Sequence, residues 1–182
     1  MLPLLRLTLF DHQGKTPMIK IALLADYPET LPTLADWFRA QWPDYFAGRT
    51  DETIAQGFRA EAQRTSLPVR LVAFGDDGTL AGTVVLRERA MDALPDFTPG
   101  LGGLFVTEAH RGRGVGSELV RACMDAARTQ GHVRLYAATA TAHGLLARLG
   151  WSPLTTIQHG DEGLTIYVCS LPSPDNHAAS AQ

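Results

Sequence analysis

Residues 104–117 read LFVTEAHRGRGVGS, and this stretch decides how the middle of the 182-residue chain folds. An apolar segment predicts a short strand over 101–106, and a helix is expected from Val115 to about Arg128. Three glycines, at 112, 114 and 116, let the backbone turn tightly and point several N–H groups inward. The helix start adds unpaired N–H groups and the positive end of its dipole. Together with two arginines, which add fixed charge, this order of parts predicts a site for a phosphorylated ligand.

Length and composition bound the class of protein. Hydrophobic residues make up 45% of the chain and charged residues 19%, as in a single soluble globular domain. The formal net charge of −3 provides no global cationic field, so we expect no nucleic-acid partner. No apolar run approaches the ~20 residues of a membrane span, so no membrane partner is expected either. The two cysteines, Cys123 and Cys169, have no metal-ligand spacing, which predicts no metal and fits a reducing, cytoplasmic location.

The chain divides into three parts by composition. We expect residues 1–17 to form an N-terminal extension, residues 18–171 to form one domain, and the Pro-, Ser- and Ala-rich residues 172–182 to form a flexible tail. No internal repeat and no second domain is evident. The sequence leaves open whether the protein is a monomer or a homodimer.

Apolar periodicity and turn residues predict an alternation of strands and helices. A hairpin over 69–89 has its turn at Asp76-Asp77-Gly78. A strand, the helix from Val115 and a strand over 133–139 form a βαβ unit, whose two strands should be parallel. Further strands are expected over 19–25, 155–159 and 164–170, and further helices over 31–41, after Thr50, and over 142–149. The fold class is therefore α/β: a mixed, mostly antiparallel sheet of six to seven strands with helices on both faces.

The spacing of the glycine-rich turn excludes two common phosphate motifs. A P-loop requires a lysine that is absent here, and a dinucleotide fingerprint requires G-x-G-x-x-G, whereas residues 112–116 read G-x-G-x-G. Arg111 to Gly116 instead matches [R/Q]-x-x-G-x-[G/A] and closely resembles the acetyl-CoA loop of the GNAT superfamily of N-acetyltransferases. The resemblance extends to the following strand, VRLYAAT, and to LLARLGW, which is similar to the family's "fYeklGF" helix end.

The resemblance implies a function and a cofactor site. The expected reaction is acetyl transfer from acetyl-CoA by direct attack of a primary amine, carried by a small molecule or a peptide. The cofactor's pantetheine arm would pair with the backbone of one strand, where the N–H near Val106 would polarise the thioester carbonyl. The cofactor-binding residues implied are Leu104, Phe105, Val106, Arg111, Gly112, Arg113, Gly114, Val115, Gly116 and Ser117.

The family's usual general acid is missing. Aligning Gly150-Trp151 with "fYeklGF" puts Leu146 at the tyrosine position, and leucine donates no proton. His143, one turn away, is the candidate acid, with Tyr136 and Ser117 as alternatives. A non-catalytic acyl-CoA-binding or sensing protein is the alternative function that this substitution leaves open.

The acceptor half of the site has fewer signals. Glu88, at the end of the second hairpin strand, is the candidate general base, with Asp92 and Asp96 as alternatives. The aromatic loop over 42–46 corresponds to one wall of the acceptor pocket in the family. Nothing in the sequence specifies the acceptor itself.

Overall fold

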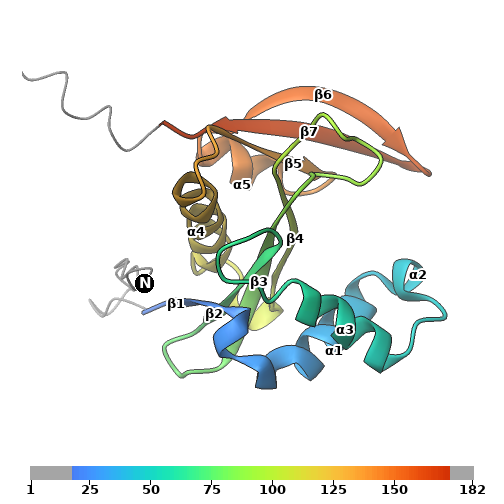
Figure 1. The fold of residues 1–182 in the computed structure, drawn as a ribbon, viewed down its shortest axis with the longest axis vertical. Coiled ribbons are helices and arrows are strands. Elements are labelled where there is room, and N and C mark those ends of the chain that lie inside the picture. Colours follow the sequence, from blue (N-terminus) through green and yellow to red (C-terminus); the bar gives the residue numbers. More distant parts are fainter. Residues whose placement is uncertain (1–17, 173–182) are drawn as a thin grey trace, which may run out of the picture.

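The computed structural model describes residues 18–172, and these residues form a seven-stranded sheet flanked by helices (Figure 1). The expectations for residues 1–17 and for residues beyond 172 lie outside this part of the chain. The order of strands across the sheet is β1-β2-β3-β4-β5-β7-β6, and only β4 and β5 run parallel. The strands are β1 (Lys20–Leu23), β2 (Val69–Phe74), β3 (Leu80–Arg87), β4 (Gly100–Val106), β5 (Arg134–Thr139), β6 (Ser152–His159) and β7 (Glu162–Ser170). The predicted fold class is confirmed.

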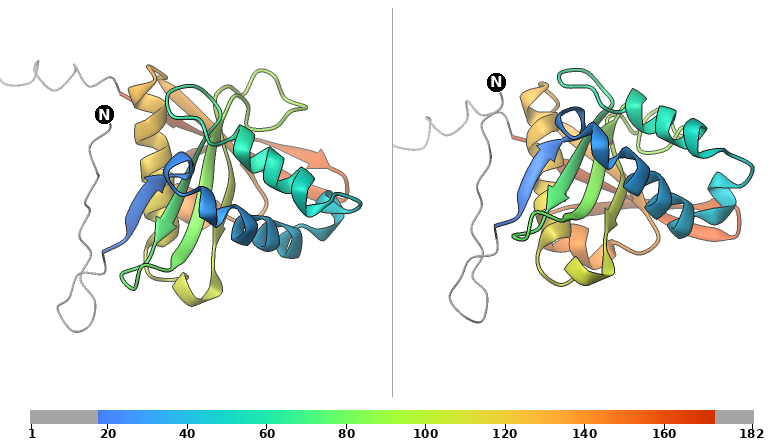
Figure 2. Two further views of the ribbon diagram at one scale, coloured as in Figure 1. Left: turned by 60° about the horizontal axis from the view of Figure 1, so that its bottom comes forward. Right: turned by 90° about the horizontal axis from the view of Figure 1, so that it is seen from below.

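Helices cover both faces of the sheet (Figure 2). One face carries α1 (Leu31–Gln41), the short α2 (Pro43–Phe46) and α3 (Asp51–Ala60), and the other carries α4 (Val115–Thr129) and α5 (His143–Arg148). Short 3₁₀ helices are η1 (Leu24–Asp26), η2 (Pro28–Thr30) and η3 (Glu108–His110). Strand β2 shows why two cores form: Leu71 packs in the cluster under α4, whereas its neighbour Val72 packs under α1 and α3.

The hairpin of β2 and β3 follows from its turn. Gly78 has a φ of +77°, which glycine adopts without strain, and the Asp77 carboxylate accepts bonds of 2.9 and 2.6 Å from the N–H and hydroxyl of Thr79. The hairpin places Arg70 opposite Val85, so the two side chains share a face. One side of β2 and β3 therefore presents Arg70 and Val85 toward α1 and α3.

The parallel pair β4 and β5 is short. Its register covers only Gly100 with Tyr136 and Leu101 with Ala137, although β4 continues to Val106 and β5 to Thr139. A bulge at Gly103, whose φ is +52°, interrupts the pairing of β4 with β3 between Thr83 and Val85. The sheet is therefore split on the β5 side of β4, which leaves backbone groups of β4 without a neighbouring strand.

Several expected boundaries were wrong in detail. Strand β1 ends at Leu23 because Leu24 to Asp26 form η1, and β3 ends at Arg87 rather than at residue 89. The expected aromatic loop contains α2, which begins at Pro43. Strand β4 does not enter the glycine-rich turn directly, because η3 lies between them. Within 18–172, no helix is long and apolar enough to cross a membrane.

Candidate active site: the cofactor side

The glycine-rich turn presents a run of backbone donors. Gly112 and Gly114 have φ values of +72° and +86°, and Gly114 is the N-cap of α4. Within the described residues, the amides of residues 112–117 donate to no backbone or side-chain acceptor, whereas the next amide, that of Glu118, bonds to the Gly114 carbonyl at 3.0 Å. Successive free N–H groups at the start of a 15-residue helix are an anion-binding cradle. A pyrophosphate requires donors of this kind, and the binding of one by these residues stays a prediction.

The open side of β4 adjoins this cradle. The Thr107 amide donates to the Ala81 carbonyl of β3 at 2.9 Å, so alternation along the strand turns the Val106 amide to the opposite, unpaired side. The Val106 carbonyl accepts a 3.2 Å bond from Arg111 Nε, which ties the turn back to the strand. An extended ligand lying against β4 beyond Leu101 therefore meets backbone groups as a further strand would.

Leu146 is a core residue in this structure. Its side chain is 1% exposed and belongs to the cluster under α4. The neighbouring Leu145 lies beside the start of α4, where a Cβ on Gly116 would be 3.5 Å from its Cδ2. The helix end of "fYeklGF" type thus packs α5 against the start of α4.

His143 begins α5 and has partners on both ring nitrogens. Its Nε2–H donates to the Ala140 carbonyl at 2.8 Å, which leaves Nδ1 as the acceptor for the Tyr167 hydroxyl at 3.2 Å in the neutral ring. Tyr136, an alternative acid, packs its ring against Phe97 with centroids 5.5 Å apart. Ser117 lies in the first turn of α4, beside the free amides. None of these positions tests the role of His143, which stays a prediction.

Candidate active site: the acceptor side

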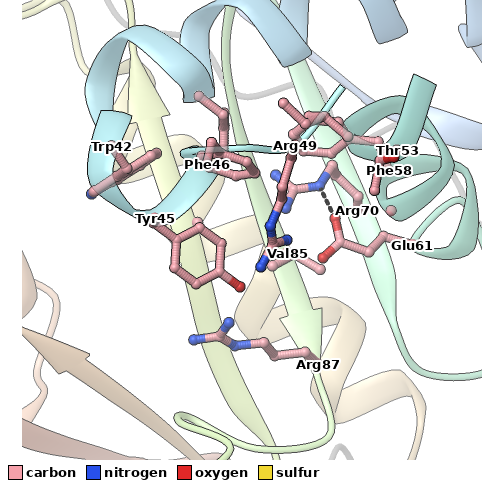
Figure 3. A pocket seen from close by; sticks show the side chains of 14 residues that line it. Trp42, Tyr45, Phe46, Arg49, Thr53, Phe58, Glu61, Arg70, Val85 and Arg87 are labelled. Atoms are coloured by element: carbon pink, nitrogen blue, oxygen red, sulfur yellow. Dashed lines mark hydrogen bonds and ion pairs between the residues drawn. The ribbon is translucent and has the colours of Figure 1, made fainter. Parts of the chain in front are cut away.

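A cavity of about 390 Å³ lies on the opposite face of the sheet, between α1–α3 and strands β2–β4 (Figure 3). Its outer wall includes Trp42, Tyr45 and Phe46, which are the aromatic residues of the expected acceptor wall. Gly103 of β4 also lines it, one residue before the segment Leu104–Val106. The full lining is Phe38, Trp42, Tyr45, Phe46, Arg49, Thr53, Ile54, Gly57, Phe58, Glu61, Arg70, Val85, Arg87 and Gly103.

Arg70 is the buried polar centre of this cavity. Its Nε donates to Glu61 Oε2 at 2.6 Å, its Nη1 donates to Thr83 Oγ1 at 3.2 Å, and its guanidinium lies between the rings of Phe38 and Phe58, 5.1 and 4.8 Å from their centroids. Burial lowers the pKa of Arg70 below its ordinary value, and the Glu61 carboxylate opposes that shift. Gly103 leaves the necessary space, because a Cβ there would lie 3.1 Å from Arg70 Nη2.

Arg87 and Arg49 also reach the cavity, and neither pairs with a carboxylate of the described residues. Arg87 Nη2 donates to the Ala90 carbonyl at 2.6 Å, but its buried Nε has no acceptor within residues 18–172. The Arg49 guanidinium lies 4.7 Å from the ring centroid of Tyr45. In Figure 3 the side chains of Arg49, Tyr45 and Arg87 extend into one space, while a dashed line joins Arg70 to Glu61.

The predicted base lies outside this lining. Glu88 is exposed and directly follows β3, and Asp92 and Asp96 are exposed in the loop before β4. The carboxylate that does line the cavity, Glu61, is paired with Arg70. The base role of Glu88 stays a prediction.

Sequence analysis missed Arg49, Glu61, Arg70 and Arg87. One available signal is the run V-R-L-V-A-F of β2, in which a charged residue stands inside a strand buried on both faces. A charge in such a place requires a partner or a function. Nothing comparable marks Glu61, because it follows a helix and looks like an ordinary surface residue.

The comparisons with known proteins agree with this architecture. The α/β domain combines a sheet that is split beside β4, a run of free amides next to the split and an aromatic cavity on the other face. The model of the acetyltransferase (GNAT) family matches residues 31–151, which is more than half of the chain. The protein therefore belongs to the GNAT acetyltransferase family.

Solved structures show the same fold at low sequence identity. A GCN5-related N-acetyltransferase from Kribbella flavida superposes with a TM-score of 0.67 at 22% identity, over 84% of this chain and 98% of its own. The yncA protein of Salmonella typhimurium, solved with its cofactor acetyl-CoA, superposes with a TM-score of 0.64 at 20% identity, over 90% of this chain and 98% of its own. An aminoglycoside 6'-N-acetyltransferase complexed with coenzyme A superposes with a TM-score of 0.65 at 16% identity, over 85% of this chain and 99% of its own. No curated protein matches the sequence.

Proposed function

We propose that this protein transfers the acetyl group of acetyl-CoA directly to a primary amine of a small molecule. The observation that carries the proposal is the run of free amides at residues 112–117, adjoining the unpaired side of β4. Binding of acetyl-CoA is supported further by the family and by the similar structures that contain CoA or acetyl-CoA. Bound there, acetyl-CoA supplies an activated thioester.

The residues of the chain have separate tasks in this proposal. The free amides and the start of α4 bind the pyrophosphate, with Arg111 and Arg113 adding charge, and the backbone of residues 104–106 aligns the pantetheine arm. The Val106 amide would donate to the thioester carbonyl oxygen, where such a donor is typically worth about 3 kcal/mol to the transition state. The cavity on the α1–α3 face holds the acceptor.

The transfer forms one bond and breaks one. The amine nitrogen bonds to the thioester carbon, the carbon–sulfur bond breaks, and the sulfur keeps the electron pair. The ammonium proton passes to a base, for which we propose Glu88 through water, because its side chain is exposed beside the cavity strand β3. The thiolate receives a proton from His143 or from solvent, and a thiol with an ordinary pKa near 8.5 leaves acceptably without strong acid assistance.

An aromatic cavity of about 390 Å³ favours a small molecule over a folded protein as acceptor. The test is release of CoA thiol from acetyl-CoA by the purified protein, with amino acids, polyamines, aminoglycosides and short peptides as acceptors. We expect amine-dependent release with at least one small amine. Tight CoA binding without release for any acceptor would support the sensing function instead.

A further inference from the structure

The charges of the acceptor cavity do not balance. Three arginines and one glutamate line it. Arg70 and Glu61 neutralise each other across 2.6 Å, which leaves Arg49 and Arg87 without a carboxylate in the described part of the chain. Two unpaired guanidinium groups facing one cavity favour an anion and disfavour a cation.

Arg87 is fixed in position with free donors. Its Nη2 is held by the Ala90 carbonyl at 2.6 Å, and its guanidinium fills the side-chain space of Gly102, where a Cβ would lie 2.5 Å from Cζ. The Nε atom is buried against β4 and is not exposed to the cavity, whereas Nη1 donates to no acceptor within residues 18–172, so a ligand can bond to Nη1 at the end of the side chain. A planar oxyacid group matches the geometry of a guanidinium.

Arg49 approaches the same space from the other side. It lies in the loop between α2 and α3, where its guanidinium stacks on Tyr45 at 4.7 Å and Phe46 at 5.5 Å. These aromatic contacts keep the charge over the cavity and leave its N–H groups without a carboxylate. The two arginines thus flank one cavity from a strand and from a loop.

We infer that the acceptor is a small amine that also carries an oxyacid group, a carboxylate or phosphonate, bound between Arg87 and Arg49 while its amine points toward β4. This inference rests on the proposed function and names the substrate class of the same site. Gly103 lines the cavity and Val106 is three residues further along β4, about 10 Å away at the usual rise of a strand. The acid and the amine are therefore separated by several bonds, and polyamines are poor acceptors.

The test uses matched pairs of amines with the intact protein and saturating acetyl-CoA. The pairs are β-alanine with β-alaninamide and γ-aminobutyrate with its amide; aminoethylphosphonate and spermidine are added. Loss of the carboxylate makes the amine a weaker base and leaves more of it deprotonated, so intrinsic reactivity favours the amides. We expect kcat/KM about tenfold or more higher for the acids.

Variants of Arg87 and Arg49 test whether these arginines cause the preference for acids over amides. Arg87→Gln should remove the acid preference through KM, with a smaller effect on kcat, and the exposed Arg49→Gln should weaken it without affecting folding. Arg59→Gln is the matched control, because this arginine is 53% exposed on α3 and absent from the cavity lining, and it should keep the preference. Equal or better turnover of the amides or spermidine would overturn the inference and leave the proposed function standing.

If no acceptor turns over, calorimetry of the same pairs with CoA-saturated protein decides. Binding of the acids alone, lost in Arg87→Gln, would support the anion site and contradict the transfer reaction. Binding without preference for the acids, or no binding, would overturn both the anion site and the proposed transfer reaction.

Discussion

A Cβ atom on Gly102 would lie 2.5 Å from Cζ of Arg87, so the guanidinium of Arg87 occupies space that only glycine leaves open. This contact joins β4, along which we propose that the cofactor lies, to a charge in the proposed acceptor cavity. We predict that Gly102→Ala displaces the guanidinium, because it is the flexible end of its side chain. KM for the acceptor should rise by about tenfold, as expected for one charge-assisted contact, while the Kd of CoA stays unchanged. Gly163→Ala in β7, with no atom closer than 4.0 Å, is the control. An unchanged acceptor KM would contradict the placement of Arg87.

The cofactor turn is tested by two glycines with similar backbones. Gly114 and Gly160 have φ values of +86° and +58°, so alanine at either position should lower the free energy of unfolding by about 1–2 kcal/mol. Only Gly114→Ala should also weaken CoA binding in calorimetry, because it alters the run of amides at residues 112–117. Equal CoA affinity in the two variants would remove the turn from the binding site.

The ion pair of Arg70 with Glu61 in the cavity also stabilises the folded protein. Arg70 is 3% exposed at its side chain and Glu61 26%. Glu61→Ala leaves the arginine buried without its counterion, and we expect a loss of about 3 kcal/mol in denaturant unfolding, at the low end for buried pairs because water reaches Glu61. The exposed pair of Glu52 with Arg59 provides the comparison, and Glu52→Ala should change stability little. Equal losses of stability in Glu61→Ala and Glu52→Ala would contradict the prediction and show that Arg70 finds another partner.

The carboxyl group of Glu118 should make the stability of the folded protein depend on pH. Burial raises the pKa of this carboxyl above its ordinary value, although Arg121 lies 3.9 Å away. The folded state therefore binds the proton more tightly than the unfolded state, and the contribution of Glu118 to stability falls as pH rises through the interval between the two pKa values. Glu118→Gln mimics the protonated form, so it should raise Tm at pH 7 and lose this advantage near pH 4. A constant difference across this range would contradict the prediction.

The proton-transfer roles are tested by two conservative variants. If Glu88 is the base, Glu88→Gln should lower kcat by about 10²-fold or more. His143→Gln should lower kcat less, because solvent can protonate the thiolate. Asp161→Asn, in the exposed turn between β6 and β7, should leave kcat unchanged. A wild-type kcat in Glu88→Gln would remove Glu88 from the reaction.

The sequence predicts the cofactor half of the molecule better than the acceptor half, for a physical reason. Free amides at a helix start depend on local chain geometry, and three glycines before Ser117 are enough to indicate them. The cavity is built from Arg70 on one strand, Glu61 after a helix and Arg87 on another strand, and only tertiary packing brings these together. Leu146 shows a related limit: the alignment identifies it as a missing acid, whereas only the structure shows it as part of the core.

The most direct measurement follows an isotopically labelled acetyl group from acetyl-CoA in a single turnover with an amino acid acceptor. We expect one equivalent of label in the amide of the product for each equivalent of thiol, and none bound to the protein. Label recovered as free acetate or attached to the protein, with no acetylated amine, would contradict direct transfer.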